Sequence, residues 1–327
     1  MKKIIFDTSW DGMGGICRFS SEISKRLVSC SVDKLTSKPT SLFASFKLSF
    51  LMTVNKADLY VLPGYIPPFF SVSNYVFTIH DLNHIDRDEN SSFLKRLFYN
   101  FVIKPGCFSA RYVLTVSEFS RKRIIEWSGV SPEKVINVGN GVDDSFHLAV
   151  QPYLPGYSYL LCVSNRKLHK NEPRIIRAFS SANISESIKL VMTGYPSEEL
   201  STLINEYQLS ERVVFIGKVQ EERLPSLYKG SLCLVFPSLY EGFGMPIIEA
   251  NATGRVLLTS KITSIPEIAA NTAHYINPYD VSSIRKGFQK LISDDKYREK
   301  LILRGIANAK RFTIKHITEE YENIYNS

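Results

Sequence analysis

The chain has 327 residues, of which 44% are hydrophobic and 22% charged, so it can bury one large core or two ordinary ones and is not disordered. Its net charge of +8 and its pI near 9.1 favour anionic partners such as nucleotides, phosphates or acidic lipids. The basic excess is even, with 18 Lys and Arg against 14 Asp and Glu in residues 1–150 and 22 against 18 afterwards, which argues against a nucleic-acid-binding arm.

The cysteines and the start of the chain indicate the compartment. The five cysteines lack the spacing of a metal site or a disulfide framework, which predicts reduced thiols. The opening MKKIIFD has too short an apolar run for a signal peptide, because Asp7 ends it. No stretch approaches the roughly 18 apolar residues that a membrane span needs. We therefore expect a soluble cytoplasmic protein.

The first half of the chain alternates β-rich runs with helical patterns. Residues 3–7 form an apolar run that ends in the glycine-rich sequence DGMGG, and a helical pattern follows at 16–29. Further strands are expected at 57–64, 75–81, 110–117 and 134–141, with helices at 92–104 and 118–127. Strands that alternate with helices predict a parallel sheet.

After Val150, the sequence QPYLPGYS reads as a linker, and the alternation then restarts. The pattern predicts strands at 159–165, 188–194, 212–217, 231–238 and 255–260, and helices at 171–182, 197–209, 221–230 and 246–253. Residues 281–327 read as amphipathic helix, expected outside the second domain, with a crossing back to the first left open.

These patterns predict an α/β protein of two Rossmann-like domains, 1–150 and 151–327, that face each other across a cleft. Ligands of such sheets bind at the carboxyl ends of the strands. The natural site is therefore the cleft between the domains.

The segment SLYEGFGMPIIEA (238–250) carries two glutamates, Glu241 and Glu249, around a glycine turn. Gly242 and Gly244 let backbone N–H groups approach a ligand, and Pro246 suits the first turn of a helix. The helix N-terminus adds donors for phosphate, while carboxylates accept bonds from vicinal hydroxyls. We expect a ligand with both sugar and phosphate groups. The alternative is that Glu249 only complements the helix start and Glu241 is solvated.

This segment resembles the signature of the retaining GT-B glycosyltransferases of family GT4, in which two such glutamates bind the nucleotide-sugar donor. Other segments resemble family landmarks in the same order along nearly the whole chain: 14–23, 77–82, 114–124, 137–143, 161–179 and 259–280. The chain departs from the pattern at Ser164 and Leu168, where glycine and proline are usual, and at Arg255, where proline is common.

The resemblance implies a role for each matching residue. Glu241 would accept hydrogen bonds from the transferred sugar, and Glu249 would bind the ribose hydroxyls. Arg166 and Lys170 would neutralise the diphosphate, which stabilises the departing group. The donor would also be lined by the loop residues Gly14, Gly15, Gly242, Phe243, Gly244 and Met245.

His80 is expected at the transferred sugar, because FTIHDL (77–82) matches the segment that carries the family's active-site histidine. The alternative for His80 is a structural role at a strand end. For Arg166 and Lys170 the alternative is a solvated surface.

No metal is expected, since the chain has neither an Asp-x-Asp sequence nor a His/Cys cluster with ligand spacing. A fixed cationic pair and helix N-termini can stabilise a departing diphosphate instead. The resemblance implies no cofactor, and it implies retention of anomeric configuration by same-face attack.

Residues 41–56 and 91–104 mix aromatic, aliphatic and basic residues in helical patterns. Such helices favour peripheral contact with an anionic membrane that holds a lipid-linked acceptor. The alternative is ordinary core packing with solvated lysines.

We interpret the chain as a retaining hexosyltransferase of bacterial surface polysaccharide assembly. Its partners would be a nucleotide-sugar donor, with GDP-mannose and dTDP-rhamnose as leading candidates, and a saccharide acceptor, free or polyprenyl-diphosphate-linked, without nucleic acid. The competing hypotheses are a nucleotide-sugar epimerase of similar fold and a non-catalytic nucleotide-sugar-binding protein.

Overall fold

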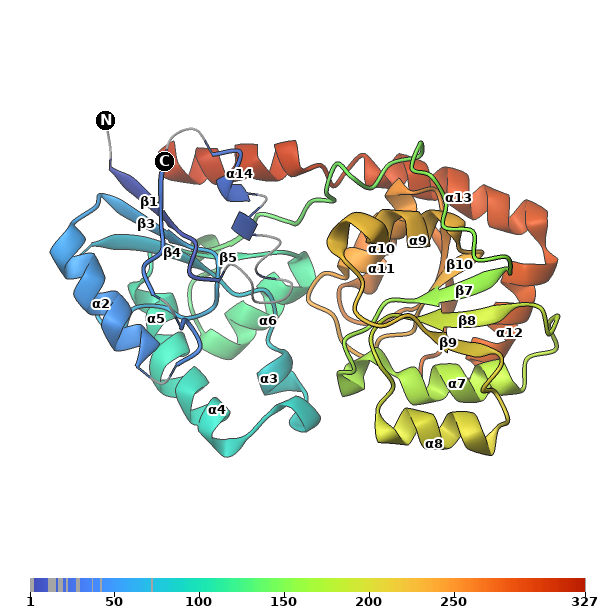
Figure 1. Cartoon of the computed structure of the whole chain (residues 1–327). Helices are drawn as coiled ribbons and strands as arrows, with labels where there is room; N and C mark the ends of the chain where they lie inside the picture. Colours follow the sequence, from blue (N-terminus) through green and yellow to red (C-terminus); the bar gives the residue numbers. More distant parts are fainter. Residues whose placement is uncertain are drawn as a thin grey trace. The chain divides into compact units, whose positions relative to one another are not determined.

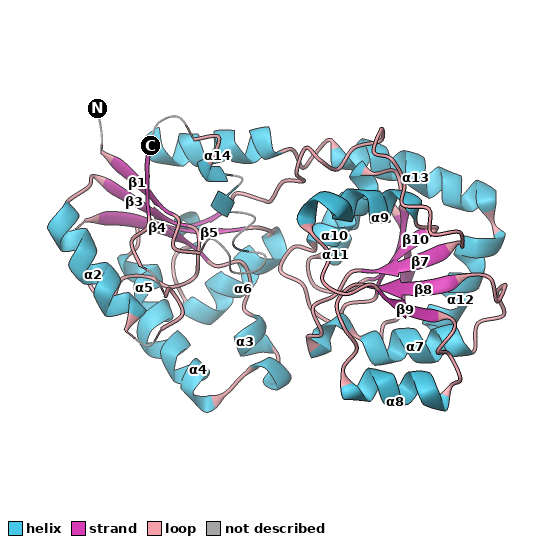
Figure 2. Ribbon diagram, viewed as in Figure 1, coloured by secondary structure: helices cyan, strands magenta, loops and turns pink. Residues whose placement is uncertain are grey.

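The structure is a computed structural model that describes residues 3–10, 16, 20–21, 23–27, 30–36, 38–41, 43–71 and 73–326. The chain divides into two compact units. Unit 1 comprises Met1–Gly141 and Thr313–Ser327, and unit 2 comprises Val142–Phe312. Figure 2 shows that each unit has its own sheet with helices on its faces.

Unit 1 is built on a parallel sheet whose six described strands run in the order β2-β1-β3-β4-β5-β6. The strands are β1 (Ile4–Asp7), β2 (Ser31–Asp33), β3 (Leu59–Leu62), β4 (Asn74–Thr78), β5 (Tyr112–Thr115) and β6 (Val135–Asn137). Their buried side chains make near-continuous apolar runs, as a sheet covered on both faces requires.

Helices cover both faces of this sheet, and in Figure 1 α2 and α5 lie on one side and α14 on the other. On the first side, Tyr60 and Phe77 share a core with Met52, Cys107 and Ile124. The helical segments of unit 1 are α2 (Ala44–Asn55), α3 (Asn83–Asp86), η1 (Asp88–Asn90), α4 (Phe93–Phe98), the π-helical turn η2 (Tyr99–Ile103), α5 (Lys104–Ser109), α6 (Glu118–Ser128), η3 (Pro132–Lys134) and α14 (Ile314–Asn326).

The last helix, α14, belongs to unit 1. Tyr321 is fully buried, with its hydroxyl 3.4 Å from that of Thr78, and Ile317 packs where a side chain on Gly139 would lie. The units therefore divide at residues 141/142 and 312/313, whereas the sequence analysis placed one boundary at 150/151. The linker-like residues 151–158 lie inside unit 2, and Tyr153 N–H donates to Ser226 O at 2.9 Å.

Unit 2 holds a second parallel sheet, whose six described strands run in the order β12-β11-β10-β7-β8-β9. The strands are β7 (Tyr159–Cys162), β8 (Lys189–Met192), β9 (Val213–Phe215), β10 (Cys233–Phe236), β11 (Val256–Ser260) and β12 (Ala273–Ile276). The chain order reverses between the neighbours β7 and β10. This is the switch point of a doubly wound sheet, where a crevice opens at the carboxyl ends of the strands.

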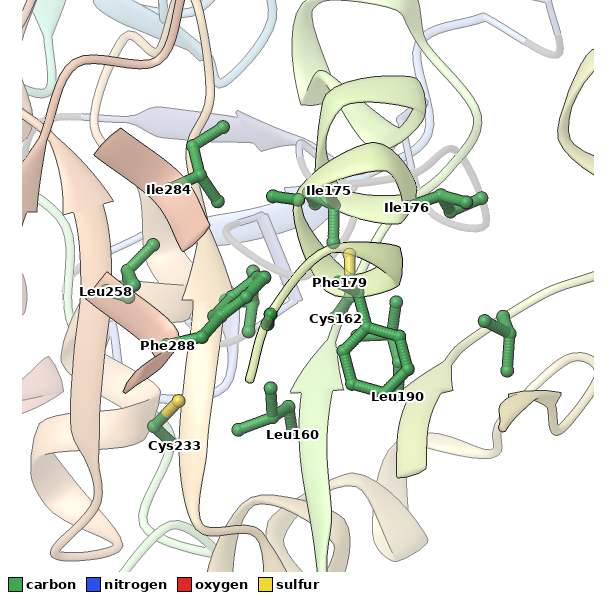
Figure 3. Close-up of a cluster of buried hydrophobic side chains, with 14 of the residues drawn as sticks. Leu160, Cys162, Ile175, Ile176, Phe179, Leu190, Cys233, Leu258, Ile284 and Phe288 are labelled. Carbon is green, nitrogen blue, oxygen red and sulfur yellow. The ribbon is translucent and has the colours of Figure 1, made fainter. Parts of the chain in front are cut away.

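The core of unit 2 lies between this sheet and helices that include α7 and α12, whose side chains are drawn in Figure 3. Ile175 and Phe179 of α7 and Phe288 of α12 pack on strand residues such as Leu160 and Leu190. The helical segments of unit 2 are η4 (Leu168–Lys170), α7 (Glu172–Ser180), α8 (Glu198–Glu206), η5 (Glu221–Arg223), α9 (Leu224–Gly230), α10 (Met245–Ala252), α11 (Ile265–Ala269), α12 (Val281–Ser293) and α13 (Asp295–Ala309).

Side-chain caps begin several of these helices close after a strand. Ser117 Oγ accepts from Ser120 N–H at 3.1 Å at the start of α6, and Asp280 Oδ1 accepts from Ser282 N–H at 2.8 Å at the start of α12. Each cap satisfies an N–H group that the first turn leaves unpaired.

Within the described ranges, none of the helices has both the length and the apolar character needed to cross a bilayer.

Candidate functional site

The centre of the candidate site is an ion pair between Lys170 and Glu241. Lys170 ends η4, which follows β7, and Glu241 follows β10, so the two come from the strands on either side of the switch point. Lys170 Nζ lies 2.7 Å from Glu241 Oε1, and the two side chains are 13% and 12% exposed. The ammonium group also lies 5.0 Å from the centre of the Phe236 ring. Two residues 71 positions apart in sequence therefore form one shielded polar group.

The loop after Glu241 is held by hydrogen bonds from the turn that follows β11. Ser264 Oγ donates to Glu241 O at 2.9 Å and to Phe243 O at 3.1 Å, and Glu241 N–H donates to Thr263 Oγ1 at 3.2 Å. The Phe243 side chain is buried edge-on against Phe312, at 5.6 Å between ring centres. Because the Phe243 ring is buried, it is the backbone of this loop that can face a ligand.

Gly244 ends the loop as the N-cap of α10, with a φ of 98° that side chains other than glycine rarely adopt. A Cβ at this position would lie 2.9 Å from Ile247 Cδ1. Gly244 has no side chain that could cap α10, and Pro246 occupies the first turn of the helix. The helix therefore presents backbone N–H groups and positive potential close to Glu241, which suits a phosphate.

Glu249 lies within α10 and is 3% exposed. Tyr228 of α9, itself fully buried, donates its hydroxyl hydrogen bond to Glu249 Oε2 at 2.6 Å. A buried carboxylate needs such partners, because burial without hydrogen bonds strongly disfavours its charged form. Tyr228 thus fixes the direction of the Glu249 side chain. The sequence pattern alone did not indicate this tyrosine as a site residue.

Arg166 is directed into unit 2 by a left-handed backbone (φ 62°) rather than toward Lys170. Its guanidinium pairs with the carboxylate of Glu172 and donates to the carbonyl of Thr193, and it lies over the Phe215 ring at 5.3 Å. Burial raises the pKa of Glu172, and the adjacent guanidinium opposes that shift. Arg166 and Glu172 therefore form a second ion pair, and Lys170 is close enough to oppose the rise in the pKa of Glu172 as well.

Asn171 connects the two sides of the switch point. It is 2% exposed and adopts a left-handed backbone (φ 63°), which asparagine tolerates. Its Nδ2 donates to Pro237 O at 3.0 Å and to Pro278 O at 2.7 Å. Together with the bond from Leu239 N–H to His169 O at 2.7 Å, these contacts hold the β7 and β10 loops together.

His80 lies in unit 1, just after β4, and its Nε2 is 2.9 Å from Pro63 O beyond the end of β3. Burial lowers the pKa of His80, against smaller opposing effects of that carbonyl and of Asp81, so the ring is neutral at pH 7. Gly14 and Gly15 lie outside the described residues.

The structure thus brings Lys170 to Glu241, with Gly242–Met245 and Glu249 following in the same loop and helix. It places Arg166 on Glu172 instead. Among the described residues, no three His, Cys, Asp or Glu side chains lie close enough to hold a metal ion. The arrangement offers a cation, a carboxylate and a helix N-terminus side by side, which is the chemistry of a phosphate-and-hydroxyl ligand.

Two family models match the chain. The model "Glycosyl transferases group 1" covers residues 150–307, and "Glycosyltransferase Family 4" covers residues 19–146.

Curated relatives carry more specific names. The chain is 30% identical to the O-antigen chain mannosyltransferase B of Escherichia coli over 76% of this chain and 69% of that protein. It is 28% identical to the O-antigen chain mannosyltransferase RfbU of Salmonella typhimurium over 67% of this chain and 61% of that protein. It also matches the Escherichia coli protein WbdA at 27% identity over 62% of this chain, but spans only 27% of WbdA.

Solved structures share the fold. The Anabaena protein HepE, crystallised with UDP and glucose, has a TM-score of 0.80 at 18% identity, with 100% of both chains covered. WaaG, a glycosyltransferase of lipopolysaccharide biosynthesis, has a TM-score of 0.75 at 14% identity, with 98% of this chain and 99% of that one covered. The predicted GT-B fold, with two Rossmann-like α/β domains, is thereby confirmed.

Proposed function

The chain belongs to the group 1 glycosyl transferases, and on that premise we propose that it moves a hexose from a nucleoside-diphosphate sugar to a saccharide in bacterial O-antigen assembly. The observation that carries the proposal is the Lys170–Glu241 pair at the switch point, beside the uncapped N-terminus of α10. The epimerase and the non-catalytic binding protein are the outcomes that would replace it.

GDP-mannose is the first candidate donor, because the curated relatives with the most extensive matches are named mannosyltransferases. dTDP-rhamnose is the second. HepE has been crystallised with UDP and with UDP-glucose, so UDP-sugars belong in any test of this chain.

Lys170 and the N–H groups of α10 would hold the diphosphate, and Glu241 would accept hydroxyls of the transferred sugar. Glu249, oriented by Tyr228, would accept the ribose hydroxyls. His80 keeps its proposed contact with the transferred sugar, and Gly14 and Gly15 their proposed contact with the phosphates. Arg166 keeps its proposed contact with the diphosphate, and its ion pair with Glu172 holds it in the loop that carries Lys170.

We propose that the reaction retains anomeric configuration. The acceptor oxygen bonds to the sugar's anomeric carbon as the bond from that carbon to the diphosphate oxygen breaks, and the acceptor's proton passes to the leaving phosphate. Negative charge grows on the diphosphate during this step, so a preorganised cation and helix N-terminus stabilise the transition state more than the ground state.

The acceptor is proposed to be lipid-linked, which would place the enzyme at the inner face of the plasma membrane. Metal independence is also proposed, since Lys170 supplies positive charge at the site. Treatment with EDTA should leave the initial rate unchanged; a loss that added Mg²⁺ or Mn²⁺ restores would contradict it.

The test is a transfer assay on the purified chain with GDP-mannose, dTDP-rhamnose and UDP-sugars, each with and without extracted lipid-linked saccharide. We expect one donor to be consumed only with acceptor, and NMR of the product to show the donor's anomeric configuration. Conversion of a donor without acceptor would identify an epimerase. Donor binding with no product under any condition would favour the non-catalytic alternative.

A further inference from the structure

The outer side of α2 carries a stripe of exposed apolar side chains. Phe43, Phe46, Phe50 and Val54 follow one another at helical spacing and are 75%, 48%, 65% and 61% exposed. The opposite side of α2 contributes Leu48 and Met52 to the core of unit 1. This helix is therefore apolar on both sides: its inner side packs in the core, whereas the side chains of its outer side remain about half exposed or more.

The loop at 67–70 extends the stripe, because it is fastened along α2. The Phe46 and Phe69 rings stack with centres 4.3 Å apart and planes at 26°. Phe69 N–H donates to Ser45 O at 3.2 Å, and Phe70 N–H donates to Ser49 Oγ at 3.0 Å. Phe69 and Phe70 are half exposed and ordered by these bonds, so their display to solvent is built into the fold.

A pocket of about 290 Å³ lies next to the stripe, between the residues before α2 and the helix α4. Its walls include Ser41, Tyr65, Ile66, Leu94, Phe98 and Tyr99. Phe93 and Leu94 at its α4 side are 75% and 73% exposed. We call the stripe, Phe69, Phe70, Phe93 and Leu94 the aromatic face; Figure 1 shows α2 and α4 within unit 1.

The charges on the two segments that carry most of the aromatic face are basic, and the acidic Asp88 and Glu89 just before α4 are paired with arginines. Residues 41–56 contain Lys47 and Lys56, residues 91–109 contain Lys95, Arg96 and Lys104, and neither segment contains Asp or Glu. Arg96 is neutralised by an ion pair with Asp88, whereas Lys47, Lys56 and Lys95 are exposed on these segments. Aromatic side chains interspersed with lysines match the interface of an anionic bilayer, where rings enter the headgroup layer and ammonium groups meet phosphates.

We propose that the aromatic face docks on an anionic lipid bilayer and that one hydrocarbon chain of a lipid enters the adjoining pocket. An anionic bilayer complements both the apolar stripe and the exposed lysines, and the acidic side chains just before α4, Asp88 and Glu89, are each paired with an arginine. The inference rests on the proposed function only for the lipid-linked nature of the acceptor, because docking itself requires neither donor nor transfer.

The first test is flotation with vesicles of phosphatidylcholine alone and with phosphatidylglycerol added. We expect the chain to float with the anionic vesicles at low salt and to be released at high salt. The double variant Phe43→Ser/Phe50→Ser should lower the partition coefficient at least about tenfold, and Lys47→Glu should lower it about fivefold or more. Serine is favoured at an N-cap, the position of Phe43, so folding should tolerate the change.

The matched control is Leu154→Ser/Leu303→Ser, which removes two side chains of unit 2 that are 78% and 63% exposed. This control should float like the unaltered chain. If the unaltered chain stays in the dense fraction at low salt, or if both double variants lose binding equally, the docking proposal is wrong. A dimer that the Phe43→Ser/Phe50→Ser variant dissociates, without vesicle binding, would instead assign the face to a second copy.

The pocket is tested by tryptophan fluorescence, because the chain has two tryptophans and each lies behind a pocket wall. The Trp10 ring is 5.3 Å from that of Tyr65, and the Trp127 ring is 5.8 Å from that of Tyr99. Lipids with brominated chains quench tryptophan only at short range, so chain entry should quench emission in anionic vesicles. If the protein floats with the vesicles but its tryptophan emission is not quenched, the docking proposal stands and the proposal that a lipid hydrocarbon chain enters the pocket is wrong.

Transfer to a water-soluble saccharide acceptor, measured in parallel, separates the two claims. Phe43→Ser/Phe50→Ser should leave this rate unchanged. Vesicle binding without transfer would contradict the proposed function alone, and transfer without vesicle binding would contradict the docking proposal alone.

Discussion

Lys170 and Glu241 neutralise each other, and this has consequences for how a donor binds. Both side chains are nearly buried, so each charge is stabilised mainly by the other. A diphosphate that approaches Lys170 adds a second anion, and Glu241 then has to share the ammonium group or bond to hydroxyls of the sugar. The pair therefore links recognition of the phosphate to recognition of the sugar.

Tyr228 gives a residue-level prediction. Tyr228→Phe removes the bond to Glu249, worth about 1.5–3 kcal/mol when the acceptor is charged. Because Glu249 would lose its orientation, we expect the KM for the donor to rise about tenfold, with a smaller change in kcat.

Tyr159→Phe is the matched control, since it removes an equally buried hydroxyl that donates to Leu227 O at 2.7 Å. It should lower stability by about 0.5–1.5 kcal/mol, because its acceptor is neutral, and leave KM unchanged. Equal KM values for both variants would show that Tyr228 has only a structural role.

The burial of His80 leads us to predict that the stability of the protein depends on pH. Burial lowers its pKa in the folded chain, so between that pKa and about 6.5 the unfolded chain binds more protons. The contribution of His80 is therefore complete above about pH 6.5 and is lost as the pH falls through this window. The free energy of unfolding, measured with urea between about pH 7.5 and pH 5, should fall less with falling pH in His80→Gln than in His316→Gln. His316 is exposed and serves as the control. Identical profiles would contradict this.

At this scale the sequence predicted Glu241, Lys170 and Glu249 as site residues but did not predict their partners in the structure. Lys170 and Glu241 are 71 residues apart, and they meet because they follow adjacent strands, which sequence spacing does not reveal. The ion pair of Arg166 with Glu172, made from a left-handed backbone, was likewise not predicted. Tyr228 reads as an ordinary helical residue, since only the tertiary packing of α9 on α10 brings its hydroxyl to Glu249.

At the scale of elements, the position of the site follows from strand order. The loops after β7 and β10 meet because these strands are neighbours although β8 and β9 intervene in sequence. Alternating patterns predicted a parallel sheet in each half but not this order. They also missed β2, β12 and α11, which have three, four and five residues. An element of three to five residues has too few side chains for a hydrophobic period to be recognised in the sequence.

Gly244 gives a prediction about the loop. Gly244→Ala adds about 1–2 kcal/mol of left-handed strain and a contact with Ile247 Cδ1 at 2.9 Å. We expect lower thermal stability together with weaker nucleotide binding. Gly156→Ala is the control. Its φ is 85°, and a Cβ there meets no described atom within 4 Å, so this variant should show the strain without a steric contact. Unchanged nucleotide affinity in the Gly244 variant would remove this loop from the site.

At the scale of the whole molecule, the chain passes between the units twice, because α14 returns to unit 1. The amphipathic pattern of residues 314–326 predicted a packed helix, but a pattern does not identify the surface on which a helix packs. That information lies in side chains such as Tyr321, which fits beside Thr78 of β4.

The return of α14 makes a prediction about local stability. Tyr321→Ala leaves a cavity in unit 1 and should lower its unfolding free energy by about 3–5 kcal/mol, while unit 2 is less affected. Phe288→Ala, a fully buried residue of unit 2, should give the opposite result. Amide hydrogen exchange distinguishes the units, and equal loss of protection in both units for each variant would contradict the division.

The central claim is that Lys170 holds the diphosphate of the donor, and calorimetric titration tests it most directly. GDP, UDP, dTDP and ADP would each be titrated into the unaltered chain, Lys170→Ala and Lys167→Ala, the last of which removes an exposed lysine of the same loop. We expect at least one nucleotide to bind the unaltered chain and Lys167→Ala equally, and to bind Lys170→Ala about 10- to 100-fold more weakly. Binding of none of the four, or equal binding to all three proteins, would contradict the account.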